Sequence, residues 1–368
     1  MHAHGVYQIN TRVWLREMAG ELDRPASLAD IPDAKLDQFS TLGFDFIWLL
    51  GIWKTGAAGR KVSATNPDWR PGYEETLGAD LREEDICGSP FAVQEYVVHP
   101  EFGGNDALRS LRDRLHARGL QLILDFVGNH TALDHPWVKE RPELYIHGTE
   151  EDLAREPYNY CRVETGRGTQ ILAHGQDPHY HGWPDTLQLN YRHPALHDAM
   201  CRQLLQIAEM CDGVRCDMAM LMLPDVFAGT WGSRSQPADG TRTTDRPFWP
   251  NAIALVRQEY RDFVFIAEVY WDKEWEMQQQ GFDYTYDKRL YDRLVRQDVQ
   301  GVRAHLERAS IDFQRKLVRF LENHDEPRAA SAFPPEVHRA AAVLVFLTPG
   351  LRLFHEGQVS IPRQSRGL

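Results

Sequence analysis

The feature that most constrains this chain is a series of short apolar runs that alternate with segments of helix length. Eight such runs recur along the sequence, at residues 6–9, 44–50, 120–126, 213–217, 263–268, 282–284, 317–321 and 351–354. A strand that is buried on both faces reads as a continuous apolar run, because neither side of its sheet meets water. Eight strand–helix repeats predict a (β/α)8 barrel, although a doubly wound open sheet would show the same local pattern.

Length and composition narrow the class of protein further. The 368 residues are enough for one such barrel or for two ordinary domains. The content of 42% hydrophobic and 26% charged residues is typical of a globular protein and excludes a disordered or collagen-like chain. The net charge of -12 disfavours a nucleic-acid-binding surface. The five cysteines form no CxxC pair, so the sequence indicates neither a zinc site nor a disulfide framework.

The first residues of the chain and its apolar stretches indicate the cellular compartment in which the protein is expected. The first residues contain no basic stretch followed by an apolar run, so we recognise no signal peptide and expect a cytoplasmic protein. No apolar stretch reaches the roughly 18 residues of a membrane-spanning helix. We therefore expect no membrane partner.

One stretch, residues 131–191, departs from the alternating pattern. It is rich in His, Pro, Gly, Tyr and Trp and shows little periodicity. A loop of this length without structure of its own would be unusual. We therefore predict a small domain inserted after the third strand, with residues 1–130 as the first part of the barrel and residues 192–368 as the remainder.

Ionisable residues follow several of the predicted strands. Asp217, Glu268 and Asp325 lie at the ends of the fourth, fifth and seventh runs. Taken singly, each acid is more often a helix cap or a surface charge. In a parallel barrel, however, the carboxyl ends of all strands open on one face, so these three acids converge. Arg215 precedes Asp217 by two residues and therefore points the same way along the strand, where it would keep Asp217 ionised. A retaining glycosidase requires one ionised carboxylate and one carboxyl group that holds a proton.

Four segments of the chain resemble the conserved segments of glycoside hydrolase family 13, the α-amylase family. They are residues 125–130, 213–217, 267–269 and 320–325, and they occur in the order typical of that family. Residues 88–104 and 348–358 are similar to further family segments. The resemblance covers about residues 5 to 357 and implies a (β/α)8 barrel with residues 131–191 as domain B.

The resemblance also implies roles for individual residues. Asp217 would be the nucleophile, Glu268 the general acid/base, and Asp325 the residue that stabilises the transition state. Phe91 stands where the family usually has a tyrosine that stacks on the sugar. The residues that we expect to bind the sugar are Arg215, His130, His324, Phe91, Asp125 and Tyr270.

This sequence departs from the family pattern at several points. Asn129 matches a common calcium ligand, but residues 187–190 lack the acidic ligand often found there, and only Asp134, Asp177 and Asp185 are further candidates. We expect no required cofactor, and the sequence leaves a structural calcium ion open. The chain is also expected to lack the eighth barrel helix and the C-terminal β-sandwich of the family.

Three functional hypotheses follow for a protein whose partner is a carbohydrate, an α-glucan or an α-linked oligosaccharide. The first is a retaining hydrolase of α-glucosidic bonds. The second is a transglycosylase or a trehalose-forming isomerase that uses the same covalent intermediate. Met220 and Leu221 replace a Lys-His pair and predict an apolar leaving-group side, which keeps the second hypothesis open. The third is a non-catalytic barrel, which is disfavoured because all three carboxylates are present.

Overall fold

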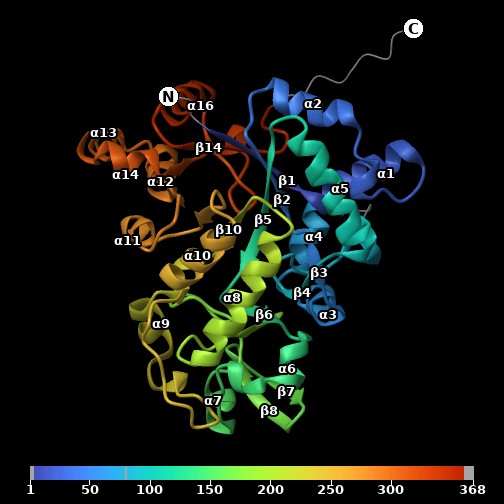
Figure 1. Cartoon of the computed structure of the whole chain (residues 1–368), viewed down its shortest axis with the longest axis vertical. Helices are drawn as coiled ribbons and strands as arrows, with labels where there is room; N and C mark the ends of the chain where they lie inside the picture. Colours follow the sequence, from blue (N-terminus) through green and yellow to red (C-terminus); the bar gives the residue numbers. More distant parts are fainter. Residues whose placement is uncertain (1–3, 79–80, 360–368) are drawn as a thin grey trace.

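The computed structural model describes residues 4–78 and 81–359, and its centre is a closed barrel of eight parallel strands (Figure 1). The strands follow one another around the barrel in the order β1, β14, β13, β12, β11, β10, β5 and β2. Their bounds are β1 (Gly5–Asn10), β2 (Phe46–Leu50), β5 (Gln121–Val127), β10 (Gly213–Asp217), β11 (Val264–Ala267), β12 (Tyr284–Tyr286), β13 (Leu317–Arg319) and β14 (Leu351–His355). All eight predicted strands are thus confirmed, and the open-sheet alternative is excluded.

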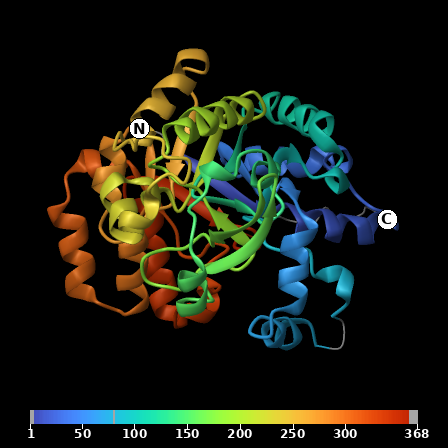
Figure 2. The ribbon, with the colours of Figure 1, turned by 90° about the horizontal axis from the view of Figure 1, so that it is seen from below.

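Helices surround the barrel on its outer side, as Figure 2 shows. The principal ones are α1 (Thr11–Leu22), α2 (Asp33–Thr41), α5 (Gly104–His116), α8 (Pro194–Ala208), α10 (Phe248–Glu259), α12 (Lys288–Val295), α13 (Val299–Arg308) and α16 (Pro335–Leu347). The chain turns from α5 into β5 through Gly119, whose φ of 72° favours glycine. Within the two described ranges, none of the helices combines the length and apolar character needed to cross a lipid bilayer.

Strand β2 shows why the barrel strands read as unbroken apolar runs. Phe46, Trp48 and Leu50 pack with side chains from other barrel strands, such as Ile123. The alternating residues Ile47 and Leu49 pack instead in the cluster that includes the surrounding helices. Because successive side chains point to opposite faces, both faces of the strand are buried and both must be apolar.

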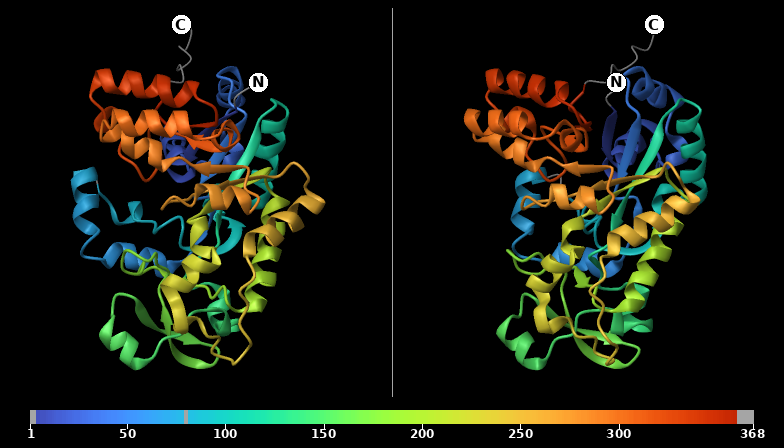
Figure 3. Two further views of the ribbon diagram at one scale, coloured as in Figure 1. Left: turned by 90° about the vertical axis from the view of Figure 1, so that its left-hand side faces the viewer. Right: turned by 60° about the vertical axis from the view of Figure 1, so that its left-hand side comes forward.

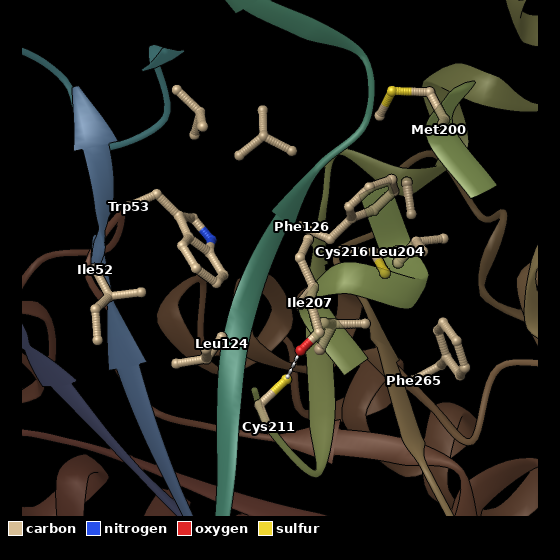
Figure 4. Packing of buried hydrophobic residues seen from close by; sticks show 14 of the residues in the cluster. Ile52, Trp53, Leu124, Phe126, Met200, Leu204, Ile207, Cys211, Cys216 and Phe265 are labelled. Carbon is tan, nitrogen blue, oxygen red and sulfur yellow. Dashed lines mark hydrogen bonds between the residues drawn. The ribbon is translucent and has the colours of Figure 1, made fainter. Parts of the chain in front are cut away.

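Figure 4 shows the packing between the barrel wall and α8. Phe126 of β5 and Cys216 of β10 belong to the same buried cluster as Leu204 and Ile207 of α8. Cys216 is fully buried there. Its neighbours on the strand must therefore face the other way, toward the barrel axis. Cys216 itself therefore points away from the barrel axis.

The connection between β5 and α8 forms a separate group of small elements at one end of the molecule (Figure 1, bottom). Strand β6 (His130–Ala132) pairs with β9 (Thr186–Gln188), and β7 (Tyr160–Thr165) pairs with β8 (Gly168–Ala173), both antiparallel. Two short helices, α6 (Pro136–Glu140) and α7 (Glu150–Arg155), accompany these pairs. The boundaries 131–191 of an inserted domain remain a prediction.

The connection between β2 and β5 contains elements that the sequence pattern did not indicate. Strands β3 (Trp53–Thr55) and β4 (Val93–Val98) pair, and between them lie α3 (Ala57–Thr65) and α4 (Arg70–Leu77). These two helices stand out from the side of the barrel in Figures 2 and 3. The predicted lack of an eighth helix and a β-sandwich concerns the chain after residue 359, outside the described residues.

Candidate active site

The three predicted catalytic carboxylates line one cavity of about 270 Å³ at the carboxyl ends of the strands. Its walls are Trp69, Ser89, Phe91, His130, Trp183, Asp185, Thr186, Arg215, Asp217, Met218, Glu268, His324 and Asp325. A larger cavity, about 590 Å³, lies between α1 and a wall that includes Leu77, Arg82 and Asp85, but contains none of the predicted catalytic residues. The smaller cavity is therefore the candidate active site.

Arg215 is the centre of the carboxylate cluster. Its side chain is 1% exposed, and its two terminal nitrogens bind different acids. Nη1 lies 2.6 Å from Asp217 Oδ1, and Nη2 lies 2.7 Å from Glu268 Oε2. The planar guanidinium fork suits such a double contact, whereas a single ammonium group would not. The 2.6 Å contact is made with Oδ1 of Asp217 and not with Oδ2.

The two oxygens of Glu268 have different surroundings. Oε2 accepts a hydrogen bond of 2.7 Å from the backbone N–H of Met218, in addition to the Arg215 contact. Oε1 accepts a hydrogen bond of 2.7 Å from the Tyr270 hydroxyl. A cation and an N–H already occupy Oε2, so a proton on this carboxyl group is best held at Oε1.

Burial raises the pKa of all three acids. Desolvation is the largest cause for Asp217 and Glu268, the Arg215 charge opposes it, and the charge of Asp217 adds to the rise of the pKa of Glu268. The pKa of Asp325 is raised to about 6, by desolvation first and by the nearby charge of Glu268 second. Asp325 is the most open of the three, with 43% of its side chain exposed. At least one acid of such a cluster holds its proton near neutral pH.

Aromatic rings form the wall around Arg215. The guanidinium carbon lies 5.2 Å from the centre of the Phe91 ring and 5.5 Å from that of Trp48. The rings of Phe91 and His324 are 5.3 Å apart. His324 Nδ1 bonds Gln8 Nε2 at 2.7 Å, and its Nε2 lies 3.1 Å from Asp325. Phe91 and His324, the two residues expected to bind the sugar, are thus part of the cavity wall.

His130 also lies in the cavity wall, where its ring is 5.0 Å from that of Trp183. It is 4% exposed, and burial lowers its pKa to about 4. The imidazole is therefore neutral at physiological pH and can both donate and accept a hydrogen bond.

Two of the predicted sugar-binding residues do not line the cavity. Asp125 lies beneath it, where Trp48 Nε1 donates to Oδ1 at 3.1 Å and the Gly51 N–H donates to Oδ2 at 2.9 Å. Burial raises the pKa of Asp125 to about 7. Tyr270 is not among the lining residues either, but its hydroxyl donates a hydrogen bond of 2.7 Å to Glu268 Oε1.

The structure corrects the prediction of an apolar leaving-group side built from Met220 and Leu221. Both belong to a short helical turn, residues 219–222, and are 0% and 3% exposed. They pack beneath the cavity and do not line it. The residue that does line it is Met218, whose backbone φ of 42° turns the chain directly after Asp217.

The surroundings of Asn129 do not fit the structural calcium ion that the sequence left open. Gln188 Nε2 donates to Asn129 Oδ1 at 2.9 Å, and Asn129 Nδ2 donates back to Gln188 Oε1 at 3.2 Å. The Asn129 oxygen that would bind the ion thus already accepts a hydrogen bond from the Gln188 amide. In the part of the chain that the structure describes, no group of three His, Cys, Asp or Glu side chains is placed to hold a metal ion. No step proposed below depends on calcium.

Several residues of the site carried no recognisable signal in the sequence. Gln8 and Trp48 sit inside ordinary apolar runs, and only the barrel closure brings them against His324 and Asp125. Trp69 comes from the unpredicted part of the connection between β2 and β5, whereas Ser89 lies within residues 88–104, which resemble a family segment. Asp185, considered only as a calcium ligand, lines the cavity, and its Oδ2 has no hydrogen-bond partner among the described residues.

Comparison with known proteins agrees with this geometry. Residues 31–360 match the family model described as the catalytic domain of α-amylase. Over 94% of its length the chain is 25% identical to α-amylase MalA of Haloarcula japonica and 22% identical to α-amylase 3 of Dictyoglomus thermophilum. The matched regions are 43% and 62% of those two proteins, so the chain spans about half the length of these relatives.

The fold has solved counterparts. An α-amylase from Lactobacillus plantarum superposes with a TM-score of 0.65 at 24% identity, covering 96% of this chain and 71% of that one. A maltogenic α-amylase from Thermotoga neapolitana gives a TM-score of 0.64 at 21% identity, covering 96% and 67%. At these identities the likeness shows the shared fold. Together with the family match over most of its length, it shows that the chain belongs to the α-amylase family, glycoside hydrolase family 13.

Proposed function

We propose that the protein is a retaining glycoside hydrolase that cleaves α-glucosidic bonds in oligosaccharides or α-glucans. One observation carries this proposal: Arg215 contacts both Asp217 and Glu268 in a cavity that Asp325 also lines. A nucleophile and a proton donor fixed by one cation are the two groups that double displacement requires. The family match supports the same class of substrate.

The first step would use the carboxylate oxygens that do not form the 2.6 and 2.7 Å contacts with Arg215. Asp217 Oδ2 attacks the anomeric carbon while Glu268 gives the proton held at Oε1 to the leaving oxygen. The bond between the anomeric carbon and that oxygen breaks, and a glycosyl ester on Asp217 forms. Asp325 and the neutral His130 would bind hydroxyl groups of the sugar as its ring flattens.

The second step restores the enzyme. Glu268, now ionised, takes a proton from a water molecule, whose oxygen attacks the anomeric carbon. The ester bond to Asp217 breaks, and the product leaves with the same anomeric configuration as the substrate. Arg215 stabilises Asp217 as a leaving carboxylate.

Product analysis with proton NMR tests the proposal directly. Incubation with maltoheptaose should release sugars that appear first as the α-anomer. Asp217→Asn and Glu268→Gln should each lower kcat more than about a thousand-fold while the thermal melt stays cooperative. Release of the β-anomer first, or near-normal turnover by either folded variant, would contradict the proposal.

Transfer to a sugar is the second candidate, because relatives with that activity are among the matches. The chain is 27% identical over 69% of its length to α-1,4-glucan:maltose-1-phosphate maltosyltransferase of Rhodospirillum rubrum, although the match spans only 30% of that protein. Products longer than the substrate, formed from maltose or maltoheptaose, would favour transfer. Exclusively shorter products would favour hydrolysis.

A further inference from the structure

Gln8 is a fully buried polar side chain on β1, on the same face of the strand as Val6, which packs inside the barrel. It lies in register with Trp48 on β2 and with His355 on β14, the two strands beside β1. Its amide meets two histidines: Nε2 lies 2.7 Å from His324 Nδ1, and Oε1 lies 3.0 Å from His355 Nδ1. The three side chains therefore form one hydrogen-bonded chain that ends at His324 in the wall of the active-site cavity.

The second ring nitrogen of His324 faces a carboxylate. His324 Nε2 lies 3.1 Å from Asp325 Oδ2 and has no hydrogen-bond partner among the described residues. Neighbouring rings hold the imidazole in place: Trp48 meets it edge-on with 5.7 Å between ring centres, and the Phe91 ring lies 5.3 Å from it. Burial lowers the pKa of His324 well below its ordinary value, so the ring is neutral and carries a single proton.

The contacts on the two sides of the ring assign this proton to Nε2. The pKa of Asp325 is about 6, so at pH 7 its carboxylate is mostly ionised and can only accept hydrogen bonds. An unprotonated Nε2 would turn a lone pair toward that negative charge. With the proton on Nε2, Nδ1 of His324 is an acceptor, and Gln8 Nε2 supplies the N–H that it needs. Gln8 Oε1 then accepts from the Nδ1–H of His355, whose ring is also neutral because burial lowers its pKa to about 4.

We propose that Gln8 is a positioning residue that holds the proton of His324 on Nε2, the nitrogen next to Asp325, where it serves as a hydrogen-bond donor at the cavity wall. The same amide holds the proton of His355 on Nδ1, so the two histidines have opposite tautomers. An N–H donor beside a carboxylate acceptor matches two neighbouring hydroxyl groups of a sugar, since one hydroxyl can accept while the other donates. The role in catalysis rests on the proposed function, whereas the tautomers are a property of the substrate-free enzyme.

Nitrogen-15 NMR of the substrate-free enzyme, labelled in its histidines, tests these tautomers. Protonated and unprotonated ring nitrogens have well-separated chemical shifts, so the tautomer of each ring is read directly. The signals are identified by their loss in His324→Gln and His355→Gln. At pH 7 we expect a proton on Nε2 of His324 and on Nδ1 of His355. A proton on Nδ1 of His324, or the same tautomer in both histidines, would overturn the inference.

Two variants of Gln8 test its role in catalysis. Gln8→Glu places a carboxylate oxygen against His324 Nδ1, so the NMR spectrum should show a proton on that nitrogen. Gln8→Met removes the N–H donor without adding a charge, and the proton should then exchange between the two ring nitrogens. Both variants should lower kcat for maltoheptaose at least about ten-fold, because a displaced donor no longer meets the sugar hydroxyl in the transition state. KM should stay within about three-fold of the wild-type value.

Gln278→Met is the matched control. Gln278 of α11 (Glu274–Gln279) is also a buried glutamine, and its Nε2 donates to Thr285 Oγ1 at 3.0 Å, but it does not line the cavity. This variant should leave both the His324 tautomer and kcat unchanged. A His324 proton that stays on Nε2 alone in both Gln8 variants, or an unchanged kcat in a variant that moves this proton, would overturn the inference. The expected tautomers in an enzyme that cleaves no α-linked sugar would instead contradict the proposed function.

Discussion

Arg215 is a buried cation that touches two of the three carboxylates of the site, so its removal leaves like charges facing each other. We expect Arg215→Met to lower the free energy of unfolding by about 3 to 5 kcal/mol, the usual cost of breaking a buried ion pair. Arg215→Lys should fall between this variant and the wild type, since one ammonium group cannot make both contacts. Urea unfolding at pH 7 measures the difference.

Arg12 offers a matched control for that experiment. It binds Glu101 at 2.6 Å, but Glu101 is 67% exposed, so water already solvates the pair. Arg12→Met should therefore change the free energy of unfolding by less than about 1 kcal/mol. A change of the same size in the Arg12 and Arg215 variants would contradict the role assigned to Arg215.

His130 makes stability depend on pH in a defined direction. Its folded pKa of about 4 lies below the ordinary value near 6.5, so between these values the unfolded chain binds a proton that the folded chain does not. Acidification through this window therefore favours unfolding. From pH 7 to pH 5, the wild type should lose about 2 kcal/mol more unfolding free energy than His130→Gln. Parallel losses in the two proteins, measured by urea unfolding, would contradict the pKa shift.

At the scale of elements, the barrel strands could be predicted, whereas the side helices could not. A strand such as β2 must be apolar at every position because both of its faces are buried, and this leaves a clear signal. Helices α3 and α4 contain glycine, proline and charged residues, and the apolar face of α4 lines a cavity rather than the core. The sequence of these two helices therefore contains no amphipathic pattern directed at a core.

Asp134 links β6 to α3. It follows β6 in the chain, and its Oδ2 accepts a hydrogen bond from the Ala58 N–H in the first turn of α3. Asp134→Ala removes this acceptor and should lower the free energy of unfolding by about 1 kcal/mol, as the loss of a helix cap does. Asp134→Asn keeps an acceptor oxygen and should lose less. Thermal melts of the two variants compare them, and equal losses would show that the hydrogen bond to α3 is not the cause.

At the scale of the whole molecule, the site exists only because the barrel closes. Asp217, Glu268 and Asp325 are far apart in the sequence, yet the parallel strands bring all three to one cavity. Their convergence could be predicted because a barrel has a single carboxyl-terminal face. The supporting contacts of Gln8 and Trp48 could not, because glutamine and tryptophan inside apolar runs look like any other strand residues until the strand register is known.

The central claim is that Asp217 becomes bonded to the sugar during the reaction. A 5-fluoro-α-glycosyl fluoride, which forms the intermediate faster than water can remove it, tests this claim by mass spectrometry of the digested protein. We expect one added glycosyl group on the peptide that contains Asp217, and none in Asp217→Asn. A glycosyl group on another residue, or turnover of this reagent without any adduct, would contradict it.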